Sequence, residues 1–332
     1  MTQTVNFFSQ IFAFCCCVCF AADVPTPAPP GKLVDLGGHR LHVNCTGRGR
    51  PIVVVEDGLG DFSFDWTLVQ SRVSRFTRIC TYDRGGYAWS DSGPMPRTFA
   101  QLNLELRDAL EKLGERGPFV MVGHSFGGPV VRNFAALYPR DVAGMVLVDS
   151  AFEGQRVGIG GEKTIRLGAG TQGRTIPRPR EAMTDADRPP ASEEGGRERS
   201  LDPMYNPLPA SVQKMRMWAQ SLDKTDYAEE SQREWSEEYF GAWLMTPQKG
   251  VLGSIPLTVL MREEGGYGDD LDVPAGQLEK ERREGQASLA LLSTKGKLTT
   301  VRSGHNMELD APAEVTAAIR AVVEAVRARG LR

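Results

Sequence analysis

Three side chains that could perform nucleophilic catalysis together stand in distinctive places along the chain: Ser125, Asp149 and His305. Ser125 is the centre of the motif G-H-S-F-G, which follows the four apolar residues 119–122. Asp149 directly follows another apolar run, and His305 follows a Ser-Gly pair near the C-terminus. A hydroxyl is a weak nucleophile at neutral pH, so it needs a base that a third group orients. These residues predict a serine nucleophile with a histidine base and an acid.

The surroundings of Ser125 predict a sharp turn between a buried strand and a helix. Residues 119–122 are all apolar, as in a strand buried on both faces. The apolar spacing after Gly127 predicts a buried helix that ends before Pro139. Gly123 and Gly127 need to be small, because bulk there would block the close approach of strand and helix around a strained serine.

The base follows by elimination among the four histidines of the chain. His39 and His42 lie in a predicted N-terminal hairpin, upstream of the serine. His124 is the neighbour of the serine, and we expect its side chain to point away from the hydroxyl. Only His305 follows both the serine and the acid, in a loop before a helix for which Asp310 is the expected N-cap.

The acid has two candidates. Asp149 ends a predicted buried strand, where a carboxylate could reach an imidazole. Glu263 comes just after the next core strand, predicted at 255–261. The acid would hold the correct tautomer of His305 and stabilise the imidazolium that forms. We favour Asp149 for this role, with Glu263 as the alternative.

Four blocks of the sequence resemble the α/β-hydrolase superfamily, and the resemblance covers nearly everything from Lys32 to Arg332. Residues 123–128 resemble the nucleophile elbow of that family and residues 304–312 its histidine block, and these two are specific together. Residues 53–60 resemble the strand with the oxyanion loop, and residues 82–90 resemble the D-x-R-G-x-G-x-S pattern. Serine, acid and histidine also occur in the chain order of the family's triads.

The resemblance implies an oxyanion hole made of the backbone N–H groups of Leu59 and Phe126. Asp57, in the first of these loops, replaces the histidine that many members have. Haloalkane dehalogenases and epoxide hydrolases of this superfamily use an aspartate nucleophile, so Ser125 favours acyl transfer to water.

Strand and helix patterns alternate along the core, which predicts an α/β fold: a mostly parallel twisted sheet with helices on both faces, as in the α/β-hydrolase fold. One helix is expected from about 98 to 113, where Thr98 and Gln101 form a capping box and Gly114 ends the helix. The expected strands lie near residues 51–55, 78–82, 119–123, 144–149, 255–261 and 297–302.

An inserted helical cap is expected between two parts of this core, at residues 32–150 and 253–332. The insertion, residues 151–252, begins with a long mobile loop at 154–209 that is rich in Gly, Pro, Arg and Glu. Helices are expected at 210–222 and 226–246. We expect three tryptophans of the cap either to pack the cap against the core or to line an apolar acyl pocket: Trp218, Trp235 and Trp243.

The first residues of the chain differ from the rest. Residues 11–22 form an unbroken apolar run that is too short to span a bilayer. They fit a signal peptide over residues 1–22, followed by a Pro-rich linker at 23–31. No Lys or Arg precedes Lys32, so a lipid-modified or membrane-anchored N-terminus is the alternative. We expect a secreted or periplasmic protein.

Two cysteines lie outside this leader, Cys45 and Cys80. The strand order that the family resemblance implies makes their two strands neighbours. We therefore expect a disulfide between them, which fits an oxidising compartment.

Composition excludes several classes of function. The 332 residues are 41% hydrophobic and 24% charged, with a net charge of −3. The chain therefore lacks the excess of basic residues that is typical of nucleic-acid-binding proteins. The spacing of His and Cys indicates no metal site, the chemistry needs no cofactor, and no stable membrane span is expected.

We expect a serine hydrolase that cleaves a small carboxylic ester with an apolar part through an acyl-enzyme on Ser125. Its partner is then a small-molecule substrate with an acyl group. Amides, lactones, thioesters and activated carbon–carbon bonds are cleaved by the same machinery. The alternative from another class is a non-catalytic small-molecule receptor, because some members of this fold keep the triad and act as receptors.

Overall fold

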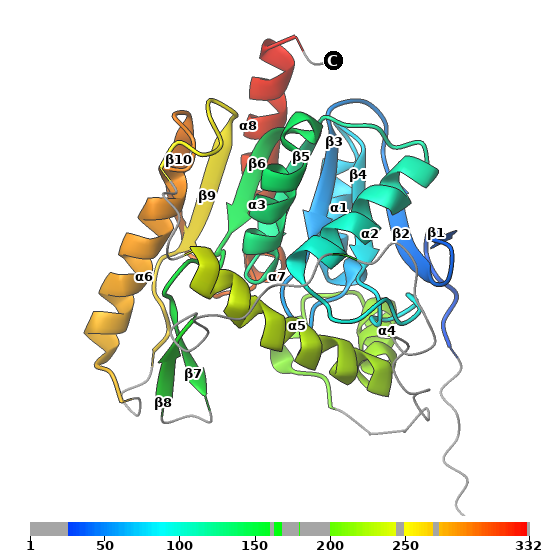
Figure 1. Ribbon diagram of the computed structural model, residues 1–332, viewed down its shortest axis with the longest axis horizontal. Coiled ribbons are helices and arrows are strands. Elements are labelled where there is room, and N and C mark those ends of the chain that lie inside the picture. Colours follow the sequence, from blue (N-terminus) through cyan, green and yellow to red (C-terminus); the bar gives the residue numbers. More distant parts are fainter. Residues whose placement is uncertain are drawn as a thin grey trace, which may run out of the picture.

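An eight-stranded sheet forms the centre of the computed structural model, which describes residues 26–159, 163–167, 179, 200–243, 249–267 and 272–330 (Figure 1). For residues 234–243 the description is limited to the backbone. The order of the strands across the sheet is β1-β2-β4-β3-β5-β6-β9-β10. Their bounds are β1 (Lys32–Asp35), β2 (Arg40–Thr46), β3 (Ile52–Glu56), β4 (Ile79–Asp83), β5 (Phe119–His124), β6 (Val142–Val148), β9 (Leu257–Arg262) and β10 (Gly296–Val301).

The predicted mostly parallel sheet is confirmed. Strand β2 pairs antiparallel with β1 and with β4, and every other neighbouring pair in this sheet is parallel. Strands β3, β4, β5 and β6 are buried along their whole length. Because both faces are covered, β3, β5 and β6 are apolar in runs instead of in alternation, whereas β4 also carries Thr81 and Asp83.

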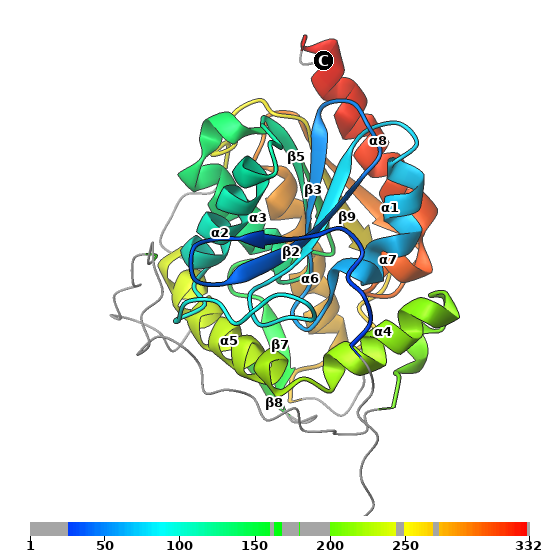
Figure 2. The same cartoon turned by 90° about the vertical axis from the view of Figure 1, so that its right-hand side faces the viewer.

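Helices cover both faces of the sheet, as predicted (Figure 2). On one face, Leu106 of α2, Phe134 of α3 and Leu289 of α6 share one hydrophobic cluster. On the other face, Val69 of α1 packs in a second cluster with Ile319 of α8. The helices of these layers are α1 (Thr67–Val73), α2 (Phe99–Lys112), α3 (Gly127–Leu137), α6 (Ala275–Ala290) and α8 (Pro312–Ala328), with the short helices η1 (Ser63–Trp66), η2 (Pro139–Asp141) and α7 (Met307–Asp310) between them.

The predicted N-cap of the last helix is wrong. Asp310 is the last residue of α7, and the long terminal helix α8 begins after it, at Pro312. The Asp310 carboxylate instead accepts a hydrogen bond from the N–H of Gly304 at 3.1 Å. Because Gly304 directly precedes His305, this contact restrains the loop that carries the histidine.

The segment between β6 and β9 holds a hairpin and two main helices. Strands β7 (Arg156–Ile159) and β8 (Lys163–Arg166) pair antiparallel, so the prediction of a mobile loop over all of 154–209 is wrong for this hairpin. Short alternating strands are hard to see in a sequence rich in Gly and charge, which explains the error. Residues 168–178 and 180–199 of the same prediction lie outside the described residues.

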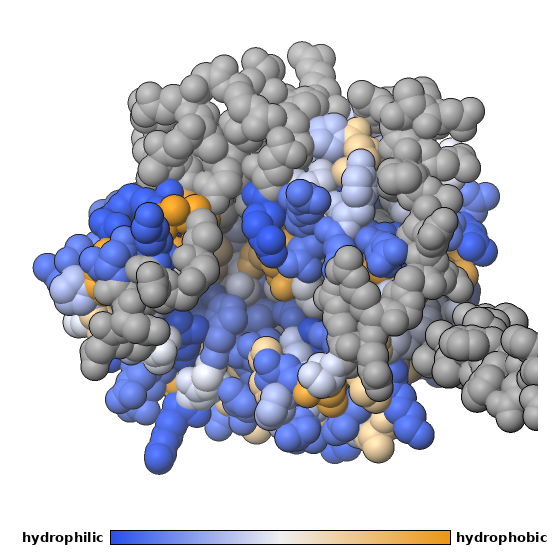
Figure 3. Space-filling view, turned by 90° about the horizontal axis from the view of Figure 1, so that it is seen from below, coloured by the Kyte–Doolittle hydropathy of each residue, from blue (hydrophilic) through white to orange (hydrophobic). Residues whose placement is uncertain are grey.

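Helices α4 (Ala210–Gln220) and α5 (Asp223–Trp243) follow the short helix η4 (Pro203–Tyr205), where helices were predicted at 210–222 and 226–246. They lie below the carboxyl ends of the parallel strands, and α5 runs across that end of the molecule (Figure 1). Seen from this side, hydrophilic residues predominate on the described surface, with hydrophobic residues between them (Figure 3). The division into a core and a separate cap stays a prediction.

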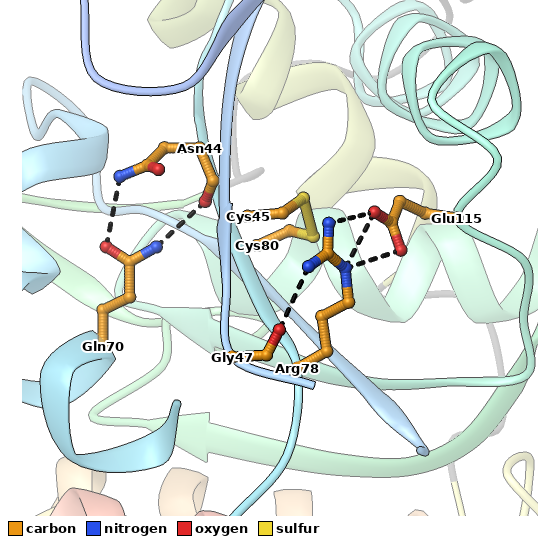
Figure 4. Close-up of a disulfide and its surroundings, with 7 residues drawn as sticks. All are labelled: Asn44, Cys45, Gly47, Gln70, Arg78, Cys80 and Glu115. Carbon is orange, nitrogen blue, oxygen red and sulfur yellow. Dashed lines mark hydrogen bonds and ion pairs between the residues drawn. A yellow bond between two sulfur atoms is a disulfide. The ribbon is translucent and has the colours of Figure 1, made fainter. Parts of the chain in front are cut away.

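A disulfide joins Cys45 of β2 to Cys80 of β4, as predicted. The two cysteines stand directly opposite each other in the antiparallel register. Next to them, Arg78 pairs with Glu115, with its Nε 2.8 Å from the carboxylate, and donates to the carbonyl oxygen of Gly47 at 3.1 Å (Figure 4). This part of the sheet is therefore held by covalent and ionic links as well as by its backbone ladder.

Candidate active site

Ser125 occupies the turn between β5 and α3, as its motif predicts. Its φ of 47° lies in the left-handed region, which is uncommon for a residue with a side chain. A Cβ on Gly127 would lie 2.2 Å from the carbonyl oxygen of Glu56, and a Cβ on Gly123 would lie 2.6 Å from that of Gly127. The two glycines therefore permit the close packing that holds the serine at the end of the strand.

The structure brings Ser125, His305 and Asp149 together in one chain of hydrogen bonds. Nε2 of His305 lies 2.9 Å from the Oγ of Ser125, and its Nδ1 lies 2.6 Å from Oδ2 of Asp149. Asp149 directly follows β6, with a φ of 37°, and its N–H donates to the carbonyl oxygen of Leu260 in β9. Ser125 and Asp149 thus lie at the carboxyl ends of the parallel strands β5 and β6, and His305 lies in the loop that follows β10.

Asp149 is held as a carboxylate. Burial would raise the pKa of this group, but the hydrogen bond from His305 and the positive charge of Arg262 together lower it below its ordinary value. Nη1 of Arg262 lies 3.0 Å from Oδ2 of Asp149. Sequence analysis missed Arg262, although it precedes Glu263 directly.

His305 is kept neutral by its surroundings. Partial burial lowers the pKa of the imidazole, the hydrogen bond to Asp149 opposes this effect, and the positive charges of His124 and Arg262 lower the pKa further. The net direction is below the ordinary value. The side chain is 40% exposed, so the ring is open to a ligand on one side. A neutral, accessible imidazole beside a hydroxyl can take up a proton.

Glu263, the alternative acid, lies elsewhere. Its N–H donates to the carbonyl oxygen of Val301, and its own carbonyl oxygen accepts from Arg283 at 3.0 Å. Among the described residues, no hydrogen bond or ion pair joins its carboxylate to His305. Asp149 is therefore the carboxylate in contact with the histidine.

The two residues expected to supply the oxyanion donors share one apolar environment, and their role as donors stays a prediction. Leu59 packs against the small cluster that contains Phe126. Phe126 immediately precedes helix α3, where the first backbone N–H groups have no partner within the helix. Nη1 of Arg84 donates to the carbonyl oxygen of Gly58 at 2.9 Å. Because the C=O and N–H of a trans peptide point in opposite directions, this contact turns the N–H of Leu59 away from Arg84.

Arg84 and the carboxyl groups around it were not predicted as site residues. Arg84 is buried and pairs with Glu56 at 2.6 Å, and it also donates to the backbone oxygen of Asp57. Burial raises the pKa of the Asp57 carboxyl well above its usual value, although the charge of Arg84 opposes this effect. The resemblance of residues 82–90 to a family block was the signal that could have identified this support of the oxyanion loop.

Three buried groups have possible metal-binding atoms within 4.8 Å of one another: Asp61, His124 and Glu308. Both ring nitrogens of His124 are already engaged, because Nδ1 lies 3.2 Å from Oδ2 of Asp61 and Nε2 lies 3.1 Å from the carbonyl oxygen of His305. A metal needs a free lone pair on one of these nitrogens. The arrangement therefore fits an ion-paired imidazolium and not a metal centre.

The tryptophans predicted for the pocket are described only in part. Trp218 is 6% exposed and packs against Trp89, with 5.2 Å between ring centroids. It thus lies in the apolar contact between α4 and the core, and a role in a substrate pocket stays a prediction. The side chains of Trp235 and Trp243 lie outside the described residues.

Comparison with known proteins agrees with this architecture. A model of the alpha/beta hydrolase family matches residues 31–319. A meta-cleavage product hydrolase from Pseudomonas fluorescens IP01 is 16% identical with a TM-score of 0.58, covering 87% of this chain and 96% of that chain. An enol-lactonase from Burkholderia xenovorans LB400 is 16% identical with a TM-score of 0.58, covering 88% of this chain and all (100%) of that chain. At these identities the similarity shows the fold alone.

Curated relatives correct the expected location. A protein named as a transporter in Hormonema carpetanum is 36% identical over 129 residues, covering 36% of this chain and 18% of that protein. A protein named as a vacuolar membrane protein in Saccharomyces cerevisiae is 34% identical over 133 residues, covering 35% of this chain and 21% of that protein. The chain spans about a fifth of the length of these relatives. Their names indicate membrane association, so the expectation of a secreted or periplasmic protein is wrong.

The cause of this error is the N-terminal apolar run. An apolar run of this kind indicates affinity for lipid, but by itself it does not show whether the segment is cleaved from the mature protein. The predicted signal peptide at 1–22 lies outside the described residues. Within the described part of the chain, none of the helices has the length and apolar character needed to cross a membrane.

Proposed function

Because the chain belongs to the alpha/beta hydrolase family, we propose that it is a serine hydrolase that cleaves a small carboxylic ester, or a related acyl compound, through an acyl-enzyme on Ser125. The observation that carries this proposal is the continuous hydrogen-bond chain from Ser125 through His305 to Asp149, with distances of 2.9 and 2.6 Å. A serine with a positive φ beside a neutral imidazole is the arrangement that makes a hydroxyl nucleophilic.

In the proposed reaction, Nε2 of His305 takes the proton of the Ser125 hydroxyl while Oγ attacks the carbonyl carbon of the substrate. The N–H groups of Leu59 and Phe126 donate to the oxygen that becomes negative, and each such donor typically lowers the barrier by about 3 kcal/mol. His305 then gives its proton to the leaving alcohol as the carbon–oxygen bond breaks. Asp149 stabilises the imidazolium while it exists.

The acyl-enzyme is cleaved by the same groups in reverse roles. His305 takes a proton from water, the hydroxide oxygen attacks the acyl carbon, and the proton returns to Oγ of Ser125 as the acid leaves. The 40% exposure of the His305 side chain supports this step, because water must reach Nε2. We propose that the cap formed around α4 and α5 governs the choice of substrate, since α5 crosses the carboxyl ends of the strands (Figure 1).

A fluorophosphonate probe tests the proposal, since it reacts with activated serines. We expect the full chain to be labelled on Ser125 and the Ser125→Ala variant to be unlabelled. A panel of esters of increasing acyl length, with lactones and carbon–carbon substrates beside it, then identifies the bond class. Wild-type protein that is folded and is neither labelled nor active on any member of the panel would contradict the proposal and favour a receptor.

A further inference from the structure

His124, the residue before the nucleophile, is a buried side chain whose two ring nitrogens both face hydrogen-bond acceptors. It is 1% exposed. Nδ1 lies 3.2 Å from the Asp61 carboxylate and Nε2 lies 3.1 Å from the backbone carbonyl oxygen of His305. Carboxylate and carbonyl oxygens only accept hydrogen bonds, so both nitrogens must carry protons to satisfy them. The geometry therefore makes His124 an imidazolium.

The charges around His124 favour this state. Oε2 of Glu308, which is fully buried, lies 3.8 Å from Nε2 of His124. Burial alone would lower the pKa of His124, but the charge of Glu308 and the hydrogen bond to Asp61 raise it to about 9. On the far side of Asp61, Arg216 of α4 lies 3.8 Å from the carboxylate and also pairs with Asp65. Two carboxyl groups therefore flank the imidazolium directly, and the Arg216 cation of α4 lies behind one of them.

His305 has the opposite arrangement. One of its nitrogens faces the Asp149 carboxylate, which accepts, and the other faces the Ser125 hydroxyl, which can donate. A neutral ring satisfies both partners. The His124 and His305 rings are only 4.8 Å apart between centroids, so a charge on one opposes a charge on the other. The titratable and charged groups that face the two rings are Asp61, Glu308, Asp149 and Arg262, with Arg216 behind Asp61. Burial raises the pKa of Glu308, and the positive charge of His124 opposes this effect.

Building on the proposed function, in which His305 is the base, we propose that His124 is a positioning residue for this reaction. Held as a cation between Asp61 and Glu308, it fixes the His305 loop through the backbone carbonyl and keeps the His305 ring uncharged. Ser125 and His124 are adjacent in the chain, so the elbow that presents the nucleophile also sets the state of its base. This role concerns the protonation of His305 and not only the packing of the core.

Ring-nitrogen NMR of the full chain tests the charge directly, without any variant and without any activity. The chain has four histidines, so the signals can be assigned by single substitutions. We expect both nitrogens of His124 to stay protonated up to about pH 8, and His305 to titrate below the ordinary value of 6.5. A His124 ring that loses its proton at or below the ordinary value of 6.5 would overturn the proposal.

Two substitutions separate the charge from the hydrogen bond. In His124→Gln, the amide can still donate to the His305 carbonyl but carries no charge. We expect the NMR titration of His305, and the acid limb of kcat/KM for a small activated ester, to move up by about one pH unit. His124→Asn is too short to reach the carbonyl, so we expect it to lower kcat/KM at the pH optimum by about ten-fold more than His124→Gln does.

His42→Gln is the matched control, because His42 is also fully buried and paired with an aspartate, Asp83, at 2.7 Å. We expect it to leave the titration of His305 unchanged. An unchanged His305 titration in folded His124→Gln would overturn the proposal. Failure of the proposed function gives a different pattern, in which Ser125 does not react with the fluorophosphonate although the NMR titrations follow the expected values.

Discussion

Two histidine–aspartate pairs with nearly the same contact lie in different parts of the sheet. Nδ1 of His305 is 2.6 Å from the Asp149 carboxylate, and Nδ1 of His42 is 2.7 Å from the Asp83 carboxylate. The pairs differ at the second nitrogen. Nε2 of His305 faces the Ser125 hydroxyl and its side chain is 40% exposed, whereas Nε2 of His42 faces a backbone carbonyl and its side chain is fully buried.

This difference shows why an aspartate contact alone does not make a histidine a base. His42 bonds to two acceptors, which holds it in a charged state, and the surrounding protein closes it off. His305 bonds to one acceptor and one hydroxyl, so it can gain and lose a proton. The His42 pair also joins β2 to β4, the strands that the Cys45–Cys80 disulfide cross-links. We therefore expect changes at the β2–β4 pair to affect stability and changes at the His305 pair to affect chemistry.

The largest contrast is expected between the two aspartates. Asp149→Asn should lower kcat for an activated ester by about 10³- to 10⁴-fold, because the neutral amide does not stabilise the imidazolium and its N–H groups can favour the wrong tautomer of His305. Asp83→Asn should leave kcat within about three-fold while lowering the free energy of unfolding. Steady-state kinetics of both variants measure the change in kcat, and urea unfolding measures the change in the free energy of unfolding.

Glu263→Gln is the test of the alternative acid. A larger loss of kcat in that variant than in Asp149→Asn would transfer the role to Glu263.

Removal of the disulfide should affect stability alone. In the chain-entropy model, opening the loop between Cys45 and Cys80, which are 35 positions apart, lowers the free energy of unfolding by roughly 3–4 kcal/mol. We expect the double variant Cys45→Ser, Cys80→Ser to show this loss in urea and to keep its kcat/KM well below its unfolding temperature. Equal unfolding free energies of the variant and the wild type would show that the cross-link does not stabilise this part of the sheet.

The smallest effect concerns the charge on His42. Burial lowers the pKa of His42, but Asp83 and the carbonyl oxygen of Pro30 raise it above the ordinary value of 6.5 overall. A raised pKa in the folded state stabilises the protein below the unfolded pKa, and this contribution is lost as the pH rises through the folded pKa. His42→Gln should therefore reduce the free energy of unfolding more at about pH 5.5 than at about pH 9. A larger reduction at the higher pH would mean that His42 is neutral in the fold.

Local sequence was sufficient to predict the turn that carries Ser125, whereas His305 was identified from its place in the chain, as the histidine that follows both the serine and the acid. The serine motif needs only a buried strand, two glycines and a helix in succession, and these are all within about twenty residues. The acid stayed open between Asp149 and Glu263 because the parallel strands β6 and β9 are neighbours in the sheet, and both end at the same edge. Only their places in the sheet and the conformation of each turn decide which carboxylate reaches the imidazole.

The charged surroundings could not be predicted in the same way. His124 is an imidazolium because Asp61, Glu308 and the carbonyl of His305 converge on it, and these come from three separate parts of the chain. The hairpin at 156–166 was missed for another reason, since its short strands carry little apolar alternation. Sequence motifs report local conformation well, whereas protonation states depend on contacts between distant segments.

The central claim is that His305 activates Ser125, and the most direct measurement is kcat for a small activated ester with purified, folded His305→Ala. We predict a loss of about 10⁵- to 10⁶-fold against wild type, with a circular dichroism spectrum and an unfolding free energy that remain close to those of the wild type. His42→Gln, measured beside it, should keep kcat within about three-fold. Wild-type turnover by folded His305→Ala would contradict the account.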